Sequence, residues 1–374
     1  MPDRDPRLTP LRAVMASGSL DAVALVPGAN FRRLLGRDFH QNERPLVLVV
    51  PAEGPPAAVV PNLEMASFST LDFRGAIFDW RDENGFEHAF RALGGALGGL
   101  GAAGARIGVE AQRMRVFEAT ALQAAFPAAQ LVDAHAAISS IRLRKAPEEV
   151  ALLRQAIRIS EAALEATLTQ VRAGMTETEV AGVLMRELFD HGADGLAFEP
   201  IVAAGDNSAQ PHARPRFDYR IRPGDALLFD FGASYQGYNA DITRTFFVAD
   251  ASEKDRAFYD TVLAANEAGR AASRAGRSAH DVDDAVQRLL EASPFAAFAR
   301  HKTGHGLGLD VHEAPQIMRG NAAVLESGMV FTVEPGLYRL GECGVRIEDD
   351  VLVTETGIDC LTTFPRELRI LGGP

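Results

Sequence analysis

The most constraining feature of this chain is a pattern that occurs twice between residues 212 and 353 and ends each time in two acidic residues. In each copy a proline follows a histidine by three residues, and the first acid follows a glycine by six. The second acid comes 11 residues after the first in one copy and 14 residues after it in the other. The two copies are His212, Pro215, Gly224, Asp230, Asp241 and His312, Pro315, Gly328, Glu334, Glu348.

Both pairs of acids lie in apolar segments, residues 226–248 and 328–353. Burying an unpaired carboxylate in such surroundings is very costly, so four of them brought together need cations. Two divalent cations would balance the four negative charges. Two such ions roughly 3.5–4 Å apart can bridge a water molecule and lower its pKa towards neutrality. The acids therefore predict a dinuclear metal site.

Strand alternation predicts how these acids meet. In the first copy Asp230 and Asp241 lie on two strands joined by a turn, so a hairpin brings them together directly or diagonally. The second copy repeats the arrangement with Glu334 and Glu348 around a Pro-Gly turn region. Arg346 stands two residues before Glu348, on the same face of the strand, where its guanidinium can hold a carboxylate.

His305 is the strongest imidazole ligand candidate. It lies in the segment HKTGHGLGLDVHE, where glycines at 304, 306 and 308 surround it. Such spacing disfavours a helix and lets the backbone pass close to another group. A ligand set of carboxylates with one imidazole suits Mn, Co or Zn better than copper or an iron–sulfur cluster.

The 374 residues predict two domains, which we place at 1–140 and 141–374. The fold class we expect is α+β. A smaller α/β domain comes first, with strands at 21–26, 45–50, 56–60, 74–78 and 105–110 and helices near 62–68, 85–98 and 112–125. The second domain sets helices against one largely antiparallel sheet made by the two repeated segments. Its helices are expected at 147–171, after Thr176, at 253–275 and at 279–292.

The seam between the domains is marked by a helix start, with Pro147 at its first position and Glu148 and Glu149 in its first turn. Thr176 followed by Glu179 is a capping box that marks a helix start. The basic residues Arg142, Arg144 and Lys145 near the seam are interpreted as a solvated linker.

Charge and composition exclude several partners. A net charge of −12 argues against nucleic acid or an anionic membrane surface as the main partner. Only two cysteines occur, Cys343 and Cys360, which is compatible with a reducing compartment. Residues 1–10 lack the apolar stretch of a signal peptide, and the apolar stretch 92–105 is too short to span a bilayer. A cytoplasmic location is therefore expected.

Five stretches together resemble the creatinase/methionine-aminopeptidase superfamily of pita-bread metallopeptidases, and within it the proline-peptidase branch. They are AAGDNSAQPHARP, IRPGDALLFDFGASYQGYNADITRTF, HKTGHGLGLDVHEAP, ESGMVFTVEPGLY and GVRIEDDVLV. The resemblance also covers residues 141–156 and is weaker over 1–140, where this branch carries a creatinase-type α/β domain. It implies a pita-bread fold for the second domain, a duplicated antiparallel sheet with covering helices.

The resemblance also implies roles for individual residues. The dinuclear metal ligands would be Asp230, Asp241, His305, Glu334 and Glu348. His212 and His312 would stand beside the metals, stabilise the tetrahedral intermediate and assist proton transfer, and Glu334 would take a proton from the bridging water. His301 would line the proline pocket. Arg346 would support the ligands from behind.

The function that follows is hydrolysis of the peptide bond between an N-terminal residue and proline, with two Mn or Co ions and with Zn as a further possibility. An Xaa-Pro dipeptidase is the first interpretation. An aminopeptidase P acting on Xaa-Pro-Yaa and longer peptides is the alternative. A non-catalytic peptide-binding relative or a metal-free creatinase-type hydrolase should lack part of the acid set. The extra N-terminal domain and His301 argue against a methionine aminopeptidase. The resemblance further implies a homodimer.

Overall fold

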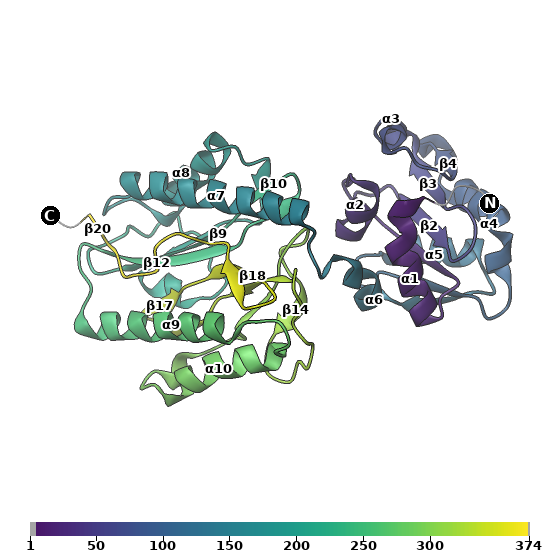
Figure 1. Cartoon of the computed structure of the whole chain (residues 1–374). Coiled ribbons are helices and arrows are strands. Elements are labelled where there is room, and N and C mark those ends of the chain that lie inside the picture. The colour runs from purple at the N-terminus through teal and green to yellow at the C-terminus, as the bar shows by residue number, and fades with distance from the viewer. Residues whose placement is uncertain (1–4, 373–374) are drawn as a thin grey trace. The chain divides into compact units, whose positions relative to one another are not determined.

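The computed structural model describes residues 5–372, and the chain divides into two compact units, Met1–Arg142 and Leu143–Pro374 (Figure 1). Residues 1–4, at the start of the first predicted domain, and residues 373–374, at the end of the second, lie outside the described residues. Within 5–372, no helix has both the length and the apolar character needed to cross a membrane. The predicted α+β class is confirmed, with an α/β unit followed by a larger unit of antiparallel sheets and helices.

The first unit is built on one six-stranded mixed sheet of order β4-β3-β2-β1-β5-β6. The strands are β1 (Ala22–Leu25), β2 (Val47–Pro51), β3 (Ala57–Pro61), β4 (Ala76–Trp80), β5 (Arg106–Val109) and β6 (Gln130–Asp133). The helices are α1 (Thr9–Gly18), α2 (Ala29–Leu35), α3 (Met65–Phe68), α4 (Glu87–Ala96), α5 (Val116–Ala125) and α6 (His135–Ser139). Successive residues of β1, β2 and β3 enter two different apolar clusters, so both faces of the sheet are buried.

Four helices and strands of this unit were not predicted: α1, α2, α6 and β6. Each is short: α1 has 10 residues, α2 has 7, α6 has 5 and β6 has 4. In such short segments burial against the sheet, rather than sequence periodicity, decides the conformation.

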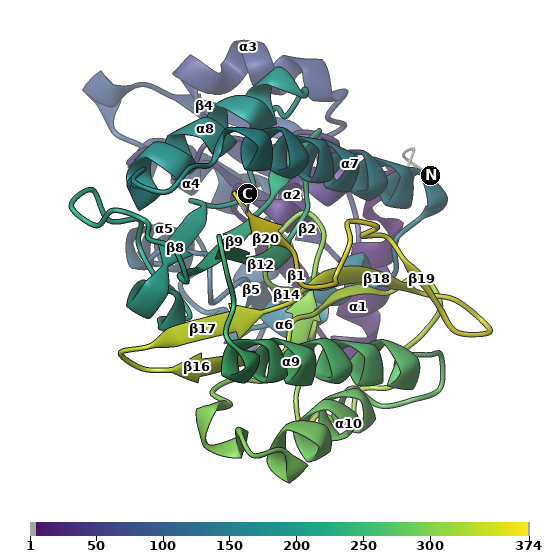
Figure 2. The same ribbon diagram turned by 90° about the vertical axis from the view of Figure 1, so that its left-hand side faces the viewer.

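The second unit repeats one structural plan. Its first half is α7 (Pro147–Gln170), α8 (Glu177–Asp190), β8 (Ile201–Ala204), β9 (Ala226–Phe231) and β12 (Ile242–Val248). Its second half is α9 (Glu253–Ala272), α10 (Ala279–Ala292), β13 (Gly304–Gly306), β15 (Val330–Val333) and β18 (Asp349–Val353). In each half a helix pair precedes three strands that pair antiparallel in chain order. Figures 1 and 2 both show the strands between α7 with α8 and α9 with α10.

A short hairpin interrupts each half between its last two strands. It is formed by β10 (Ala233–Tyr235) with β11 (Tyr238–Asn239) in the first half, and by β16 (Gly336–Arg339) with β17 (Cys343–Arg346) in the second. The remaining short strands are β7 (Gly195–Leu196), β14 (Glu313–Ile317), β19 (Ile358–Cys360) and β20 (Ile370–Leu371).

Equivalent local signals begin the second helix of each half. Thr176 caps α8, since its hydroxyl accepts from the Glu179 amide (3.1 Å) while the Glu179 carboxylate accepts from the Thr176 amide (2.7 Å). Ser278 and Asp281 make the same reciprocal pair at the start of α10. The predicted capping box at Thr176 is thus confirmed, and it has a counterpart in the second half.

The expectation of one sheet made by both repeats is wrong in detail. The strands form a four-stranded sheet, β20-β12-β9-β8, and a five-stranded sheet, β14-β13-β15-β18-β19. The two meet where the Glu348 amide donates to the Thr243 carbonyl (3.1 Å) and the Arg346 amide donates to the Thr245 hydroxyl (3.1 Å). The β16–β17 hairpin, which forms a two-stranded sheet of its own, comes just before this point in the chain. This junction brings the acids of the two copies together.

The interpretation of the basic seam as solvated is also wrong for two of its three residues. Arg142 is buried and donates its Nε to the Asn30 side-chain oxygen (2.6 Å). Lys145 is buried and forms an ion pair with Glu313. Only Arg144 is exposed. The buried cations are tolerated because polar partners satisfy them.

Loss of the α8 cap should destabilise the protein measurably. We expect Thr176→Ala to lower the free energy of unfolding by about 1 kcal/mol, because the Glu179 amide loses its acceptor. Thr176→Ser keeps the hydroxyl and should stay within a few tenths of a kcal/mol of wild type. Urea denaturation followed by circular dichroism measures both. Equal stability of the alanine and serine variants would contradict the capping role.

Candidate functional site

The strand register places the predicted acids at the junction between the two sheets. In the β9–β12 pair Asp230 stands opposite Thr243, so Asp241 lies diagonal to it, as predicted. In the β15–β18 pair Val333 stands opposite Asp349. Glu334 and Glu348 are the next residues beyond that pair, so both project from the same end of the ladder.

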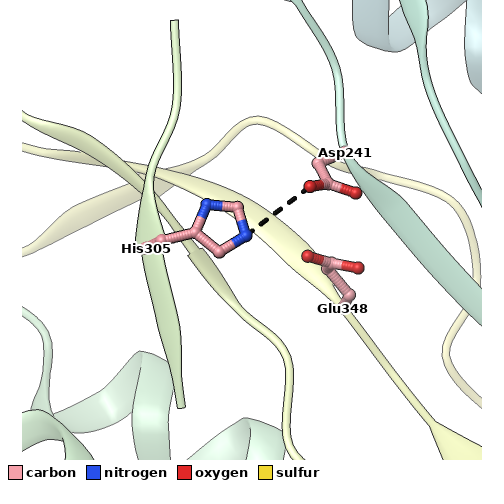
Figure 3. Close-up of side chains that lie close together, drawn as sticks. All are labelled: Asp241, His305 and Glu348. Atoms are coloured by element: carbon pink, nitrogen blue, oxygen red, sulfur yellow. Dashed lines mark ion pairs between the residues drawn. The ribbon is translucent and has the colours of Figure 1, made fainter. Parts of the chain in front are cut away.

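Three side chains from both halves converge. Atoms of Asp241, His305 and Glu348 that can bind a metal all lie within 4.8 Å of one another (Figure 3). His305 Nε2 lies 3.7 Å from Asp241 Oδ2 and 3.3 Å from Glu334 Oε1. The first half thus supplies Asp241, and the second supplies the imidazole and two carboxylates.

Hydrogen bonding defines the tautomer of His305. Its Nδ1 lies 3.1 Å from the Gly306 carbonyl oxygen, which can only accept, so Nδ1 carries the proton. The lone pair on Nε2 then faces the carboxylates. Burial lowers the pKa of His305 to about 3, which keeps the ring neutral. A neutral imidazole with its second nitrogen held in this way is the form that binds a metal.

The predicted close approach of backbone around His305 is confirmed. A methyl group added at Gly304 would lie 1.9 Å from the Thr332 carbonyl oxygen. One added at Gly306 would lie 2.0 Å from the Ala314 carbonyl oxygen. Only glycine fits at these two positions, and they set the path of β13 on both sides of the imidazole.

The Arg346 guanidinium contacts the acid cluster, as its predicted position on the Glu348 face of the strand suggests. It is buried, and its Nη2 forms an ion pair with Asp230. Its Nε donates to the Thr243 hydroxyl (3.0 Å), and that hydroxyl donates to Glu348 Oε2 (2.6 Å). One guanidinium therefore positions Asp230 directly and Glu348 through Thr243.

The electrostatics of the cluster fit divalent cations. Burial and neighbouring carboxylates raise the pKa of Asp241 and of Glu348 well above the ordinary range, and burial raises the pKa of Glu334 to about 7. Oxygens Asp230 Oδ1 and Glu348 Oε1 are buried without a hydrogen-bond partner. Arg346 offsets only one of the four charges. Unsatisfied carboxylate oxygens beside an available imidazole nitrogen are a suitable donor set for Mn, Co or Zn.

All nine predicted site residues line one pocket of about 740 Å³. Besides the four acids and the His305 imidazole already described, it contains Arg346, His212, His301 and His312. The His312 ring lies 4.1 Å from the His305 ring, between centroids. His212 and His312 are both exposed.

A chain of hydrogen bonds holds His301 in place. Its Nδ1 donates to the Lys302 carbonyl (2.8 Å), so its Nε2 accepts from the Tyr338 hydroxyl (2.7 Å). That hydroxyl in turn accepts from Arg346 Nη1 (2.7 Å). Burial, together with the charge of Arg346, lowers the pKa of His301 to about 4. His301 is therefore neutral, and both its nitrogens are occupied.

Sequence reasoning missed the residues that connect the site. Thr243 and Tyr338 link Arg346 to Glu348 and to His301, and Arg300 and Lys302 add positive charge to the pocket. Thr243 shares a strand face with Asp241, which was an available signal. The role of Tyr338 depends on the course of the β16–β17 hairpin, which the sequence does not show. Phe198, Ile201, Gln210, Pro211 and Val311 complete the lining.

Two family models match the chain. Residues 151–355 match the metallopeptidase family M24, and residues 7–144 match the creatinase/prolidase N-terminal domain. The uncharacterized peptidase YqhT of Bacillus subtilis is 38% identical over 266 residues, which covers 71% of this chain and 75% of that protein.

Solved structures show the same fold over nearly the whole chain. An Xaa-Pro dipeptidase from Bacillus anthracis is 30% identical, with a TM-score of 0.88 over 98% of this chain and 99% of that one. An X-Pro aminopeptidase from Thermotoga maritima is 28% identical, with a TM-score of 0.82 over 96% of this chain and 98% of that one. The predicted pita-bread architecture is confirmed by these matches.

The backbone around His305 should control metal binding. We expect Gly306→Ala to weaken Mn²⁺ binding at least tenfold, because the added methyl must displace β13 and with it the imidazole. Gly357→Ala, at a glycine with no neighbour near the added methyl, is the matched control and should bind as wild type does. Isothermal titration of each folded protein with Mn²⁺ measures this. Wild-type affinity in Gly306→Ala would contradict the assignment.

Proposed function

Because the chain belongs to the metallopeptidase family M24, we propose that it is a dinuclear-metal hydrolase that cleaves the bond between an N-terminal residue and a following proline. The observation that carries this proposal is the convergence of Asp241, His305 and Glu348 within 4.8 Å in the lining of a pocket of about 740 Å³. The complete acid set argues against a metal-free or non-catalytic relative.

The proposed metal ligands are Asp230, Asp241, His305, Glu334 and Glu348. Two divalent cations, Mn or Co with Zn as a further possibility, would polarise the scissile carbonyl and activate water. The ligand residues have distinct tasks in this scheme. Asp230 is fixed by Arg346, whereas Glu334 stands beside the imidazole and can accept a proton.

We assign direct roles in the reaction of the substrate to the two exposed histidines of the pocket. His212 and His312 are exposed residues of the pocket lining, where a ring N–H can donate to the oxyanion that develops at the scissile carbonyl. A histidine there can also pass a proton to the leaving nitrogen of proline. His301, with both nitrogens occupied, presents only its ring and suits packing against proline.

The site is compatible with two specificities for peptide length, that of a dipeptidase and that of a longer-peptide aminopeptidase. We propose the dipeptidase as the first of the two. The Xaa-Pro dipeptidase matches with a higher TM-score and identity than the X-Pro aminopeptidase does. The aminopeptidase is kept as second candidate because its structure also matches 96% of this chain.

Removal of metal should abolish activity. We expect a chelator to eliminate Ala-Pro hydrolysis and Mn²⁺ or Co²⁺ to restore it, since the clustered carboxylates need divalent cations to act together. Asp241→Asn should lower kcat/KM at least about 100-fold, with no recovery on addition of metal. Activity that survives exhaustive chelation, with metal loss verified by elemental analysis, would exclude the proposed mechanism.

The resemblance to the proline-peptidase branch also supports a homodimer, and the presence of only two cysteines is compatible with the expected cytoplasmic location. We expect light scattering at micromolar concentration to report about twice the chain mass of 40.1 kDa. The same measurement on a dilution series separates a stable dimer from weak association. A mass of one chain throughout the series would rule the dimer out.

A further inference from the structure

The two short hairpins that interrupt the repeated plan each contact the opposite half of the second unit. We call β10–β11 the first-half hairpin and β16–β17 the second-half hairpin. Their contacts reach the segments that carry the two exposed histidines. His212 lies in residues 210–216, which belong to no helix or strand, and His312 ends the irregular stretch 307–312 between β13 and β14. Because both rings are exposed, their positions depend on how the backbone of these segments is held.

The first-half hairpin holds the segment before His312 through one side chain. Asn239, at the end of β11, is 7% exposed. Its Nδ2 donates to the Gly308 carbonyl and to the Leu309 carbonyl (both 3.1 Å), and its amide also donates to the Gly308 carbonyl (3.0 Å). One asparagine of the first half therefore fixes two successive carbonyls of the second half, shortly before His312.

The second-half hairpin holds the segment before His212 through its backbone. The Gly344 amide, on β17, donates to the Ser208 hydroxyl (2.9 Å). A methyl group added at Gly344 would lie 2.1 Å from the Ser208 carbonyl oxygen, so only glycine lets the two backbones approach this closely. Arg346, on the same strand, donates its Nη1 to the carbonyl of Pro211 (3.4 Å), the residue directly before His212.

Each hairpin is itself fastened to the first helix of its own half. In the first half the Tyr238 hydroxyl donates to Glu149 of α7 (2.6 Å). In the second half Arg339 Nη2 forms an ion pair with Asp255 of α9 (3.1 Å). Supports that are themselves held by packing and hydrogen bonds can keep a reacting group within the narrow tolerance that catalysis needs.

We propose that the hairpins exchange support between the two halves: Asn239 of the first half positions His312, and Gly344 of the second half positions His212. This rests on the proposed function, in which both rings act on the reacting peptide. Among residues 5–372, the pocket lining includes neither Asn239 nor Gly344, so each is a positioning residue that acts through a histidine. A displacement of about 1 Å at a reacting group can cost about 100-fold in rate.

The test is a double-mutant cycle on Ala-Pro hydrolysis at saturating Mn²⁺. We expect Asn239→Ala to lower kcat about tenfold and to change KM less than threefold, because the segment before His312 loses two hydrogen bonds. The loss should persist in a His212→Ala background and disappear in a His312→Ala background. A residue that only stabilises the fold would give the same loss in both backgrounds.

Gly344→Ala should give the opposite pattern, because the added methyl displaces Ser208. Its loss in kcat, also about tenfold, should persist in a His312→Ala background and disappear in a His212→Ala background. Ser208→Ala removes only the hydroxyl that accepts from the Gly344 amide. It should show the same pattern with a smaller loss, and it replaces Gly344→Ala if thermal melting shows that variant to be unfolded.

A second measurement locates the rings without relying on activity. In the Zn²⁺-loaded protein, NMR signals of ¹⁵N-labelled histidine rings can be assigned by comparison with the two His→Ala variants. Asn239→Ala should shift the ring signals of His312 and leave those of His212 in place. Gly344→Ala or Ser208→Ala should do the reverse.

Matched controls remove the same kinds of group elsewhere. Asn62→Ala removes an asparagine that donates to Asp79 in the first unit (3.1 Å). Gly357→Ala adds a methyl where no neighbour lies within 4 Å. Both variants should keep the kcat of wild type and its histidine ring signals.

Several outcomes would overturn the inference. Equal losses of kcat in both histidine backgrounds, or equal ring shifts at both histidines, would reveal a general disturbance of the fold. Wild-type rates and ring signals in the hairpin variants, or the expected pattern for one hairpin alone, would also contradict the exchange of support. If metal-loaded wild type hydrolyses no Xaa-Pro substrate, the proposed function fails, and the ring signals alone then decide whether the hairpins position the histidines.

Discussion

Mutual repulsion of buried carboxylates is the constraint on which the rest of this structure depends. Asp241 and Glu348 are 4% and 1% exposed and face each other across the junction of two sheets. Burial, reinforced by the neighbouring carboxylates, raises the pKa of both groups well above the ordinary range. Arg346 compensates Asp230 alone. Without bound cations such a cluster opposes folding, so its assembly at one point is explained by metal binding.

Duplication is the means by which the chain assembles this cluster. Each half places a helix pair before three antiparallel strands and interrupts them with a short hairpin. Each half contributes two acids near the inner ends of its strands. The two sheets are not one continuous ladder, and they meet through a few bonds around Glu348 and Thr243. These few bonds bring acids more than 100 residues apart in sequence into contact.

Much of the site could be predicted because its residue types are unusual for their surroundings. An acid within an apolar strand, or a histidine between glycines, is costly unless it has a partner. The register of β9 with β12 then follows from alternation and a short turn. By contrast, α1, α2, α6 and β6 were missed because short segments take their conformation from what they pack against. Lys145 was misread as solvated because its partner Glu313 lies 168 residues away in sequence.

The sequence by itself determined the repeated plan, the acid set, His305 and the position of Arg346, because each follows from spacing and local periodicity. Only the tertiary structure decided which atoms meet. It turned Arg346 towards Asp230, joined it to His301 through Tyr338, and brought the Gly344 amide to the Ser208 hydroxyl. These outcomes depend on how β16, β17 and β18 pass β12, and such long-range packing has no signature in the spacing of residues along the chain.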